Sequence, residues 1–383
     1  MLCDTASNEI LCVVGARPNF MKIAPIMRAF SSNASALSAR LLHTGQHYDA
    51  AMKHAFFDQL RIPQPDIDLE VGSGTHAQQT AEIMKRFEPV LDTLKPRAVL
   101  VVGDVNSTIA CALVAVKKGV PVLHVEAGLR SGDRKMPEEI NRVLTDQLSE
   151  LLFTTESSAR DNLRREGIAD SSIHFVGNVM IDTLFFNLEN AVPAASTLAQ
   201  LGTHLRTGDR TGHDYGLLTL HRPSNVDDPA VLERLLRVLI DVSRSTPLIF
   251  PIHPRTRAQI DAAGLGDLLA GGHITMTPPL GYLEMLGLMR DARVVLTDSG
   301  GIQEETTALG IPCITLRENT ERPITVSQGS NTVVGTDPAK ILECYTDVLN
   351  TGGKSGRTPE LWDGAAAERI VAIVNQWSGA SVA

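Results

Sequence analysis

Two glycines and two glutamates follow an apolar run in the segment Asp298-Ser-Gly-Gly-Ile-Gln-Glu-Glu305. The preceding run Ala-Arg-Val-Val-Leu-Thr predicts a buried strand, so the glycines open the next helix. Free backbone N–H groups and the helix dipole at such a start favour an anion, and we expect a phosphate there. Glu304 or Glu305, one turn later, is placed to accept hydrogen bonds from a ribose. The segment predicts a nucleotide site, although a turn followed by dipole-complementing glutamates gives the same pattern.

Basic residues follow the first apolar run of the chain, in Gly15-Ala-Arg-Pro-Asn19 and the next helical turn. Arg17 supplies a fork of donors and Lys22 a point charge, which together suit a phosphate or a sugar hydroxyl. The motif Gly-x-Gly-x-x-Gly is absent at this strand end. The sequence therefore gives no support for a Rossmann dehydrogenase.

Carboxylates come directly after two later apolar runs. Asp104 follows 99–102 and Glu126 follows 121–125. Neighbouring parallel strands lie about 4.8 Å apart, so the two side chains are expected to reach one substrate and to act as an acid/base pair. The alternative for each is to cap the helix that follows. Glu138 and Glu139 come after Pro137 at a helix start, where complementing the dipole is the simpler interpretation.

Histidine and arginine follow two strands of the second half, in His221-Arg222-Pro and His253-Pro-Arg. Together with Arg322 and the Ser299-Gly300-Gly301 helix start, they are expected to surround a diphosphate with positive charge. The histidine spacing does not match a zinc site, and no loop of alternating carboxylates indicates calcium. We therefore expect neither a metal nor another cofactor.

These residues need parallel strands to bring them to one sheet edge. Short runs of Val, Ile and Leu alternate with amphipathic segments, which is typical of parallel strands with crossover helices. The predicted strands are 10–14, 39–43, 98–102, 121–125, 151–154 and 173–176 in the first half, and 215–220, 248–251, 273–276, 293–297 and 313–316 in the second. The looser stretch 192–215 predicts a connection. We therefore expect two doubly wound α/β domains with a cleft between them, and ligands at the carboxyl ends of the strands.

Composition limits the classes of function. The 383 residues are 43% hydrophobic and 21% charged, with a net charge of −9. The acidic balance argues against a general nucleic-acid or membrane-surface binder, so an anionic ligand must meet a local cluster of cations. The five cysteines show no Cys-x-x-Cys spacing. No signal-peptide pattern begins the chain, and no apolar run is long enough to span a bilayer. We expect a cytoplasmic protein.

Seven motifs together resemble those of the non-hydrolysing UDP-N-acetylglucosamine 2-epimerases. They occur in order from about Leu11 to Gly335, and they are Gly-Ala-Arg-Pro, Gly103-Asp104, His-Val-Glu-Ala-Gly-Leu-Arg, Pro-Glu-Glu-Ile-Asn-Arg, His221-Arg222, Asp-Ser-Gly-Gly-Ile-Gln-Glu-Glu and Thr-Glu-Arg-Pro. The resemblance implies a GT-B architecture. It places a first Rossmann-like domain at 1–182, with a C-terminal helix at 365–383 packing back on it, and a UDP-binding domain at 183–364. It also implies a homodimer that interconverts UDP-N-acetylglucosamine and UDP-N-acetylmannosamine.

The resemblance assigns roles residue by residue. The positions matching the family's catalytic residues are Arg17, Asp104, Glu126, Glu138 and His221, with Lys22 in support; those matching its nucleotide-binding residues are Ser299, Gly300, Glu305 and Arg322. Gln46 and His47 match residues that hold a second, activating nucleotide sugar in bacterial relatives, and Arg222 belongs to the same set. This chain has Pro223 where those relatives have a second arginine. Relatives acting on UDP-2,3-diacetamido sugars also carry Gly-Ala-Arg-Pro, and a hydrolysing epimerase or a GT-B glycosyltransferase remain alternatives.

The expected chemistry begins at the C1–O bond. The C2 proton of such a sugar is not next to a carbonyl, so breaking the bond to UDP first, or nearly first, is needed to acidify it. Arg17, His221, Arg322 and the helix start would stabilise the departing diphosphate. Asp104 and Glu126 would then serve the two faces of C2 as base and acid, with Glu138 assisting. The intermediate is 2-acetamidoglucal, and readdition of UDP gives the epimer.

Overall fold

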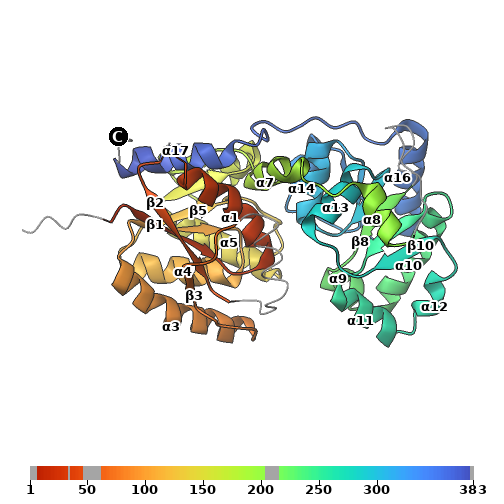
Figure 1. Ribbon diagram of the computed structural model, residues 1–383, viewed down its shortest axis with the longest axis horizontal. Coiled ribbons are helices and arrows are strands. Elements are labelled where there is room, and N and C mark those ends of the chain that lie inside the picture. Colours follow the sequence, from red (N-terminus) through yellow and green to blue (C-terminus); the bar gives the residue numbers. More distant parts are fainter. Residues whose placement is uncertain (1–6, 33–34, 46–61, 203–214, 380–383) are drawn as a thin grey trace, which may run out of the picture. The chain divides into compact units, whose positions relative to one another are not determined.

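The computed structural model describes residues 7–32, 35–45, 62–202 and 215–379. The chain forms two compact units (Figure 1). The first unit comprises the chain up to Phe186 and again from Glu360, and the second comprises Asn187–Pro359. Each unit has one parallel sheet, so the predicted fold class of two Rossmann-like α/β domains is confirmed. No helix in the described ranges is long and apolar enough to cross a membrane.

The sheet of the first unit has the strand order β3-β2-β1-β4-β5-β6-β7 within the described chain. Its strands are β1 (Glu9–Val14), β2 (Ser38–His43), β3 (Ile67–Asp68), β4 (Ala98–Val102), β5 (Val122–Val125), β6 (Leu151–Thr154) and β7 (Ile173–Phe175). Every residue of β4, β5 and β6 is buried because helices cover both faces. The order reverses between β1 and β4, which is where ligands bind in such sheets.

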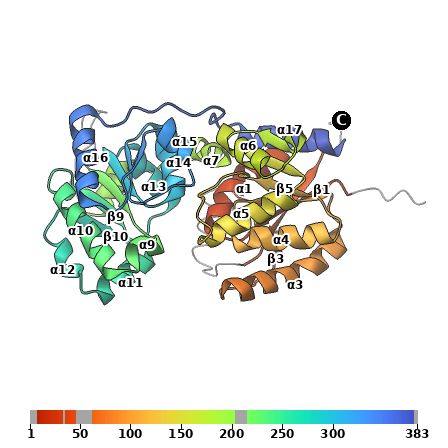
Figure 2. The same ribbon diagram turned by 180° about the vertical axis from the view of Figure 1, so that it is seen from behind.

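Helices cover the two faces of this first sheet. They are α1 (Arg17–Phe30), α3 (His76–Leu94), α4 (Asn106–Lys117), α5 (Pro137–Leu148), α6 (Ser157–Arg165), α7 (Val179–Leu188) and α17 (Ala366–Ser378). Figures 1 and 2 show α1 and α17 together on one face and α3 and α4 on the other.

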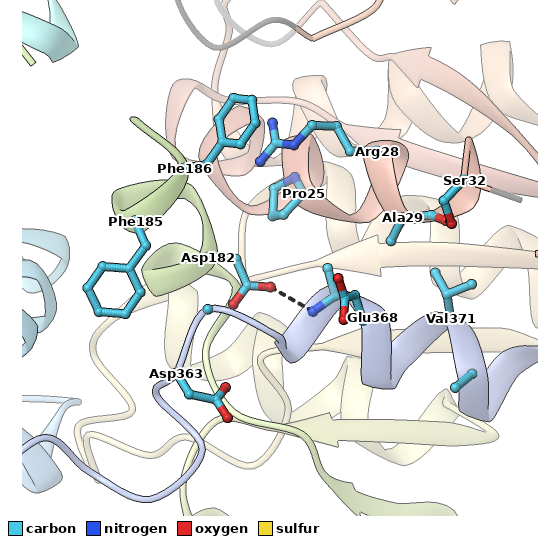
Figure 3. Close-up of a pocket in the computed structure, with 13 residues that line it drawn as sticks. Pro25, Arg28, Ala29, Ser32, Asp182, Phe185, Phe186, Asp363, Glu368 and Val371 are labelled. Atoms are coloured by element: carbon cyan, nitrogen blue, oxygen red, sulfur yellow. Dashed lines mark hydrogen bonds between the residues drawn. The ribbon is translucent and has the colours of Figure 1, made fainter. Parts of the chain in front are cut away.

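The C-terminal helix is attached to the first unit by a buried carboxylate. Asp182 on α7, labelled in Figure 3, accepts hydrogen bonds from the N–H groups of Ala366 (3.1 Å) and Ala367 (2.7 Å), at the first turn of α17; the figure draws one of these two bonds. Burial raises the pKa of Asp182 to about 6, although these two bonds act in the opposite direction. Nearby, the buried indole of Trp362 donates to the Thr155 carbonyl at 3.0 Å.

The sheet of the second unit has the strand order β10-β9-β8-β11-β12-β13 within the described chain. Its strands are β8 (Gly216–Thr219), β9 (Leu248–Pro251), β10 (Ile274–Thr277), β11 (Val294–Thr297), β12 (Cys313–Thr315) and β13 (Asn331–Val333). Its helices are α8 (Ala194–Gln200), α9 (Pro223–Val226), α10 (Pro229–Ser243), α11 (Pro254–Ala262), α12 (Gly266–Leu269), α13 (Tyr282–Arg290), α14 (Gly300–Leu309), α15 (Pro323–Ser327) and α16 (Pro338–Thr351). Leucines of α10 and the apolar face of α16 pack with the strands in one core.

Three elements depart from the sequence expectations. The edge strands β3 and β13 were not predicted, because Ile67-Asp68 and Asn331-Thr-Val are too short and too polar to form an apolar run. The helix α8 lies within 192–215, which we expected to be irregular. Its alanines and Leu198 favour a helix, and Ala194, Thr197 and Leu198 are buried.

Candidate functional site

The turn after β4 places a carboxylate beside a buried guanidinium. Gly103 has φ of +68°, and a Cβ at this position would come within 2.8 Å of the Lys22 ammonium, so a larger residue would be strained and would have to displace the Lys22 side chain. The next residue, Asp104, lies 2.5 Å from Arg142 of α5 through its Oδ2. No described side chain caps α4, whose N-cap is Val105. The Asp104 side chain is 23% exposed, which leaves it accessible to a ligand.

Glu126 follows β5 in the left-handed conformation, with φ of +73°. Such a conformation costs about 1–3 kcal/mol for a non-glycine residue and is found preferentially at functional sites. Its buried carboxylate pairs with the Lys22 ammonium. The Oε2 atom lies 3.2 Å from the Cβ position of Gly103, so the turns after β4 and β5 meet. The structure thus pairs the predicted residues Lys22 and Glu126 and places both beside the turn that carries Asp104.

The turn after β1 is held by Asn19. Its Oδ1 accepts from the N–H groups of Gly15 (3.3 Å) and Ala16 (3.0 Å), and its Nδ2 donates to the Val102 carbonyl at 3.0 Å. A single amide therefore joins the ends of β1 and β4. The side chain of Arg17 lies outside the described part of the chain, as do Gln46 and His47.

The two glutamates at the start of α5 have different surroundings. Glu139 is buried and accepts from the N–H groups of Ser131 and Gly132, each at 3.0 Å, and it pairs with Arg142. Burial favours the neutral acid, but these bonds and Arg142 keep the pKa of Glu139 below its ordinary value. Glu138 is half-buried and has no hydrogen bond or ion pair with any described residue.

Arg142 was not among the predicted site residues. It is 3% exposed at its side chain and bridges Asp104 and Glu139. The sequence signal was present, because Asn141 and Arg142 follow the two glutamates at helical spacing. Asn141 also contacts the turn, donating to the Asp104 carbonyl at 2.9 Å.

In the second unit, Asp298 holds His221 in place. Asp298 is fully buried, and its carboxylate lies 2.8 Å from His221 Nδ1 and accepts from the N–H groups of His221 and Arg222. Burial favours the neutral acid, but His221 and the backbone N–H groups hold the pKa of Asp298 below its ordinary value. The His221 side chain is 37% exposed, so the ring edge beyond Nδ1 remains reachable by a ligand.

Three arginines converge on Glu321 and Glu304. Glu321 pairs with Arg222 at 3.3 Å and with Arg317 at 2.9 Å, and Arg322 pairs with Glu304 at 2.7 Å. Burial would raise the pKa of Glu321, but the arginines outweigh it and lower that pKa to about 2. The cluster has three cations and two anions. Arg317 was not predicted, since nothing in the local sequence distinguishes it from a surface arginine.

The predicted helix start lies beside this cluster. Ser299 is the N-cap of α14 but its side chain makes no cap with the described backbone, and Gly300 and Gly301 form the first turn. A Cβ on Gly300 would lie 3.1 Å from Glu321 Oε1. The N–H groups of this turn are therefore positioned for an anion near the arginines.

Glu305, the predicted ribose ligand, is buried against Tyr282. The Tyr282 hydroxyl donates to Glu305 Oε1 at 2.9 Å. Burial raises the pKa of Glu305 to about 7; Tyr282 lowers it, and neighbouring Glu304 raises it further.

His253 has a local structural role. It is the exposed N-cap of α11, and its Nδ1 accepts from the Arg255 N–H at 3.2 Å. Its ring lies 5.8 Å from that of His221, centroid to centroid, so the two predicted histidines are neighbours. Arg255 pairs instead with Asp227, at 2.7 Å.

A cavity of about 690 Å³ in the first unit contains none of the predicted residues. It lies between α1, α7 and α17 and is lined by Arg28, Phe185, Phe186 and Asp182 among others (Figure 3). Among the residues that the structure describes, no group of His, Cys, Asp and Glu side chains could hold a metal ion.

Comparison with known proteins identifies the family. The sequence profile of the UDP-N-acetylglucosamine 2-epimerase family matches residues 30–375, so the chain belongs to that family. A UDP-N-acetylglucosamine 2-epimerase of Methanococcus maripaludis is 42% identical, over 96% of this chain and 98% of that protein. A UDP-2,3-diacetamido-2,3-dideoxy-D-glucuronate 2-epimerase of Pseudomonas aeruginosa is 41% identical, over 88% of this chain and 90% of that protein.

A solved structure extends the similarity to three dimensions. The UDP-GlcNAc 2-epimerase of Methanocaldococcus jannaschii, crystallised with UDP-GlcNAc and UDP, is 40% identical to this chain. It superposes with a TM-score of 0.85 over 96% of this chain and 99% of that one.

Proposed function

We propose that the protein interconverts UDP-N-acetylglucosamine and UDP-N-acetylmannosamine by elimination and readdition of UDP. The observation that carries the proposal is that the turns bearing Asp104 and the left-handed Glu126 meet in the first unit, and that each carboxylate is paired with a buried cation. Family membership supports the choice of substrate, as do the UDP-GlcNAc and UDP bound to the Methanocaldococcus epimerase.

The second unit binds the leaving group in this proposal. The first turn of α14 at Gly300 and Gly301 receives a phosphate, and Arg222, Arg317 and Arg322 supply positive charge around it. Asp298 orients His221 toward the diphosphate, and Glu305 accepts hydrogen bonds from the ribose. These groups stabilise UDP as the electron pair of the C1–O bond passes to its phosphate oxygen.

The first unit moves the proton at C2. One of the two residues Asp104 and Glu126 accepts the C2 proton on its carboxylate as the C1–C2 double bond forms. The other residue donates a proton to the opposite face when UDP returns. Lys22 and Arg142 hold these carboxylates in place. Glu138, which has no partner among the described residues, assists at the cationic centre.

Incubation with UDP-N-acetylglucosamine in deuterium oxide tests the proposal by proton NMR. Both nucleotide sugars are expected to carry deuterium at C2. Epimer that forms without solvent deuterium would contradict proton transfer, and accumulating free N-acetylmannosamine would identify a hydrolysing enzyme instead.

A second candidate substrate is a UDP-2,3-diacetamido sugar, which the 41% identity to the Pseudomonas epimerase favours. Comparing kcat/KM for UDP-N-acetylglucosamine and for UDP-2,3-diacetamido-2,3-dideoxy-D-glucuronate decides between them. A larger value for the second sugar would replace the substrate proposed here while retaining the reaction.

The family resemblance also leads us to propose a homodimer located in the cytoplasm. Light scattering at several protein concentrations tests the first statement. Localisation of a tagged chain tests the second.

A further inference from the structure

A buried carboxylate on α5 joins three parts of the loop that follows β5. Asp146 Oδ2 accepts from the Gly128 N–H at 3.1 Å and lies 2.7 Å from the Arg130 guanidinium. Its Oδ1 lies 2.6 Å from His124 Nδ1. The side chains of Asp146 and His124 are both 0% exposed. Neither residue has a role in the function proposed above.

His124 extends this connection to the turn after β4. Its Nε2 lies 2.9 Å from the Gly103 carbonyl oxygen. A carbonyl oxygen only accepts, so Nε2 carries a proton and donates it. Nδ1 faces Asp146, and the imidazole therefore links α5 to the residue that precedes Asp104.

The far end of the network is also fixed. Arg130 pairs with Glu166 through two contacts, one of them 2.8 Å long, and donates to the Leu129 carbonyl at 2.7 Å. With Arg130 anchored in this way, Asp146 cannot turn toward another partner without leaving a buried charge unpaired.

Glu126 lies in the middle of the segment that the network holds. His124 precedes it by two residues and Gly128 follows it by two, with φ of +79° at Gly128 and +73° at Glu126. A non-glycine residue keeps the left-handed conformation only where its surroundings determine it. Asp146 contributes to that constraint on both sides of Glu126, in addition to the Phe153 carbonyl, which accepts from the Glu126 N–H at 3.0 Å.

We propose that Asp146 and His124 are positioning residues, which set where the carboxylates of Glu126 and Asp104 lie during proton transfer. The inference rests on the proposed function for its reaction, while its geometry does not depend on that function. Misplacing a reacting group by about 1 Å costs on the order of 100-fold in rate. A loss of this size in kcat, with nucleotide affinity unchanged, is the expected signature.

Two substitutions of one side chain separate positioning from general stability. In His124→Gln the amide nitrogen lies near the position of Nε2 and can donate to the Gly103 carbonyl, whereas in His124→Asn it lies near Nδ1 and cannot reach. We expect His124→Asn to lower kcat about 100-fold and His124→Gln to stay within about tenfold of wild type. The dissociation constant of UDP, measured by calorimetry, is expected to be the same for both.

His174 provides the matched control. It is a half-buried histidine of β7 in the same sheet, and its Nε2 has no hydrogen-bond partner among the described residues. His174→Gln and His174→Asn are expected to keep the wild-type kcat. Equal values of kcat for the two His124 variants, or an unchanged kcat in His124→Asn, would overturn the proposal.

A spectroscopic measurement on the wild-type chain needs neither turnover nor a stable variant. With ¹⁵N-labelled histidine, the His124 Nε2 proton should give a resonance that exchanges slowly with solvent and is lost in His124→Gln. Absence of any slowly exchanging histidine ring proton would refute the geometry. A wild-type chain that shows this proton but does not exchange hydrogen at C2 would instead refute the proposed function.

Discussion

Glu305 is a buried carboxylate whose ionisation is expected to govern both the stability of the second unit and its affinity for a ribose. Burial raises its pKa from 4.5 to about 7. Because the folded-state pKa lies above the unfolded one, the free energy of unfolding is highest below about pH 4.5, where the carboxyl group is neutral in both states. It falls as the pH rises through 7. The shift corresponds to a penalty of about 3 kcal/mol in alkaline solution.

The substitution Glu305→Gln removes the charge and keeps the side-chain oxygen that accepts from the Tyr282 hydroxyl. We expect the variant to unfold at higher temperature than wild type at about pH 8. The gain in the free energy of unfolding should approach about 3 kcal/mol and disappear toward pH 5. Scanning calorimetry across this range measures it, with Glu343→Gln on the exposed face of α16 as control.

The same substitution is expected to weaken nucleoside binding. If ionised Glu305 accepts hydrogen bonds from both ribose hydroxyls, as we propose, the affinity of the wild type for uridine should rise about tenfold between pH 6 and pH 8. Uridine is the appropriate probe because it carries no titrating phosphate. A stability difference between variant and wild type that does not change with pH, or a variant that is less stable at pH 8, would refute this account of Glu305.

Three further substitutions test the first unit. Asp104→Asn is expected to lower kcat for epimerisation by about 10³-fold while the UDP dissociation constant stays unchanged, and a loss confined to UDP binding would reassign the residue. Lys22→Met leaves the buried Glu126 carboxylate without its cation, so we expect the free energy of unfolding to fall by about 3 kcal/mol. The loss should be visible as a lower Tm, and an unchanged Tm would contradict this expectation. Arg142→Lys keeps the charge but cannot bridge Asp104 and Glu139 with a fork, so kcat should fall by about 10- to 100-fold, whereas wild-type activity would show that charge alone suffices.

The strands that the sequence predicts well are those buried on both faces. β4 consists entirely of apolar residues and β11 of three apolar residues and a buried threonine, and such runs have few alternatives to a central parallel strand. β3 and β13 depend on pairing with a neighbour that is already in place, because Ile67-Asp68 and Asn331-Thr-Val carry no pattern of their own. Edge strands of two or three residues are thus determined by tertiary contacts.

The positions of candidate site residues follow from the sequence better than their partners do. Asp104 and Glu126 end adjacent strands, so their approach follows from topology alone. The choice of Arg142 as the partner of Asp104, or of Asp298 as the partner of His221, depends on how α5 and β11 pack. The left-handed conformation of Glu126 is likewise imposed by its surroundings, since glutamate has no preference for it.

The acidic chain meets an anionic ligand by concentrating cations locally. With a net charge of −9, long-range attraction cannot bring a diphosphate to this protein. Glu321 explains how Arg222 and Arg317 remain close to each other: its pKa of about 2 keeps it ionised, and it pairs with both. A diphosphate would offer the same two guanidinium groups a stronger acceptor. The carboxylate of Glu321 therefore preorganises the arginines that sequence motifs identify only in part.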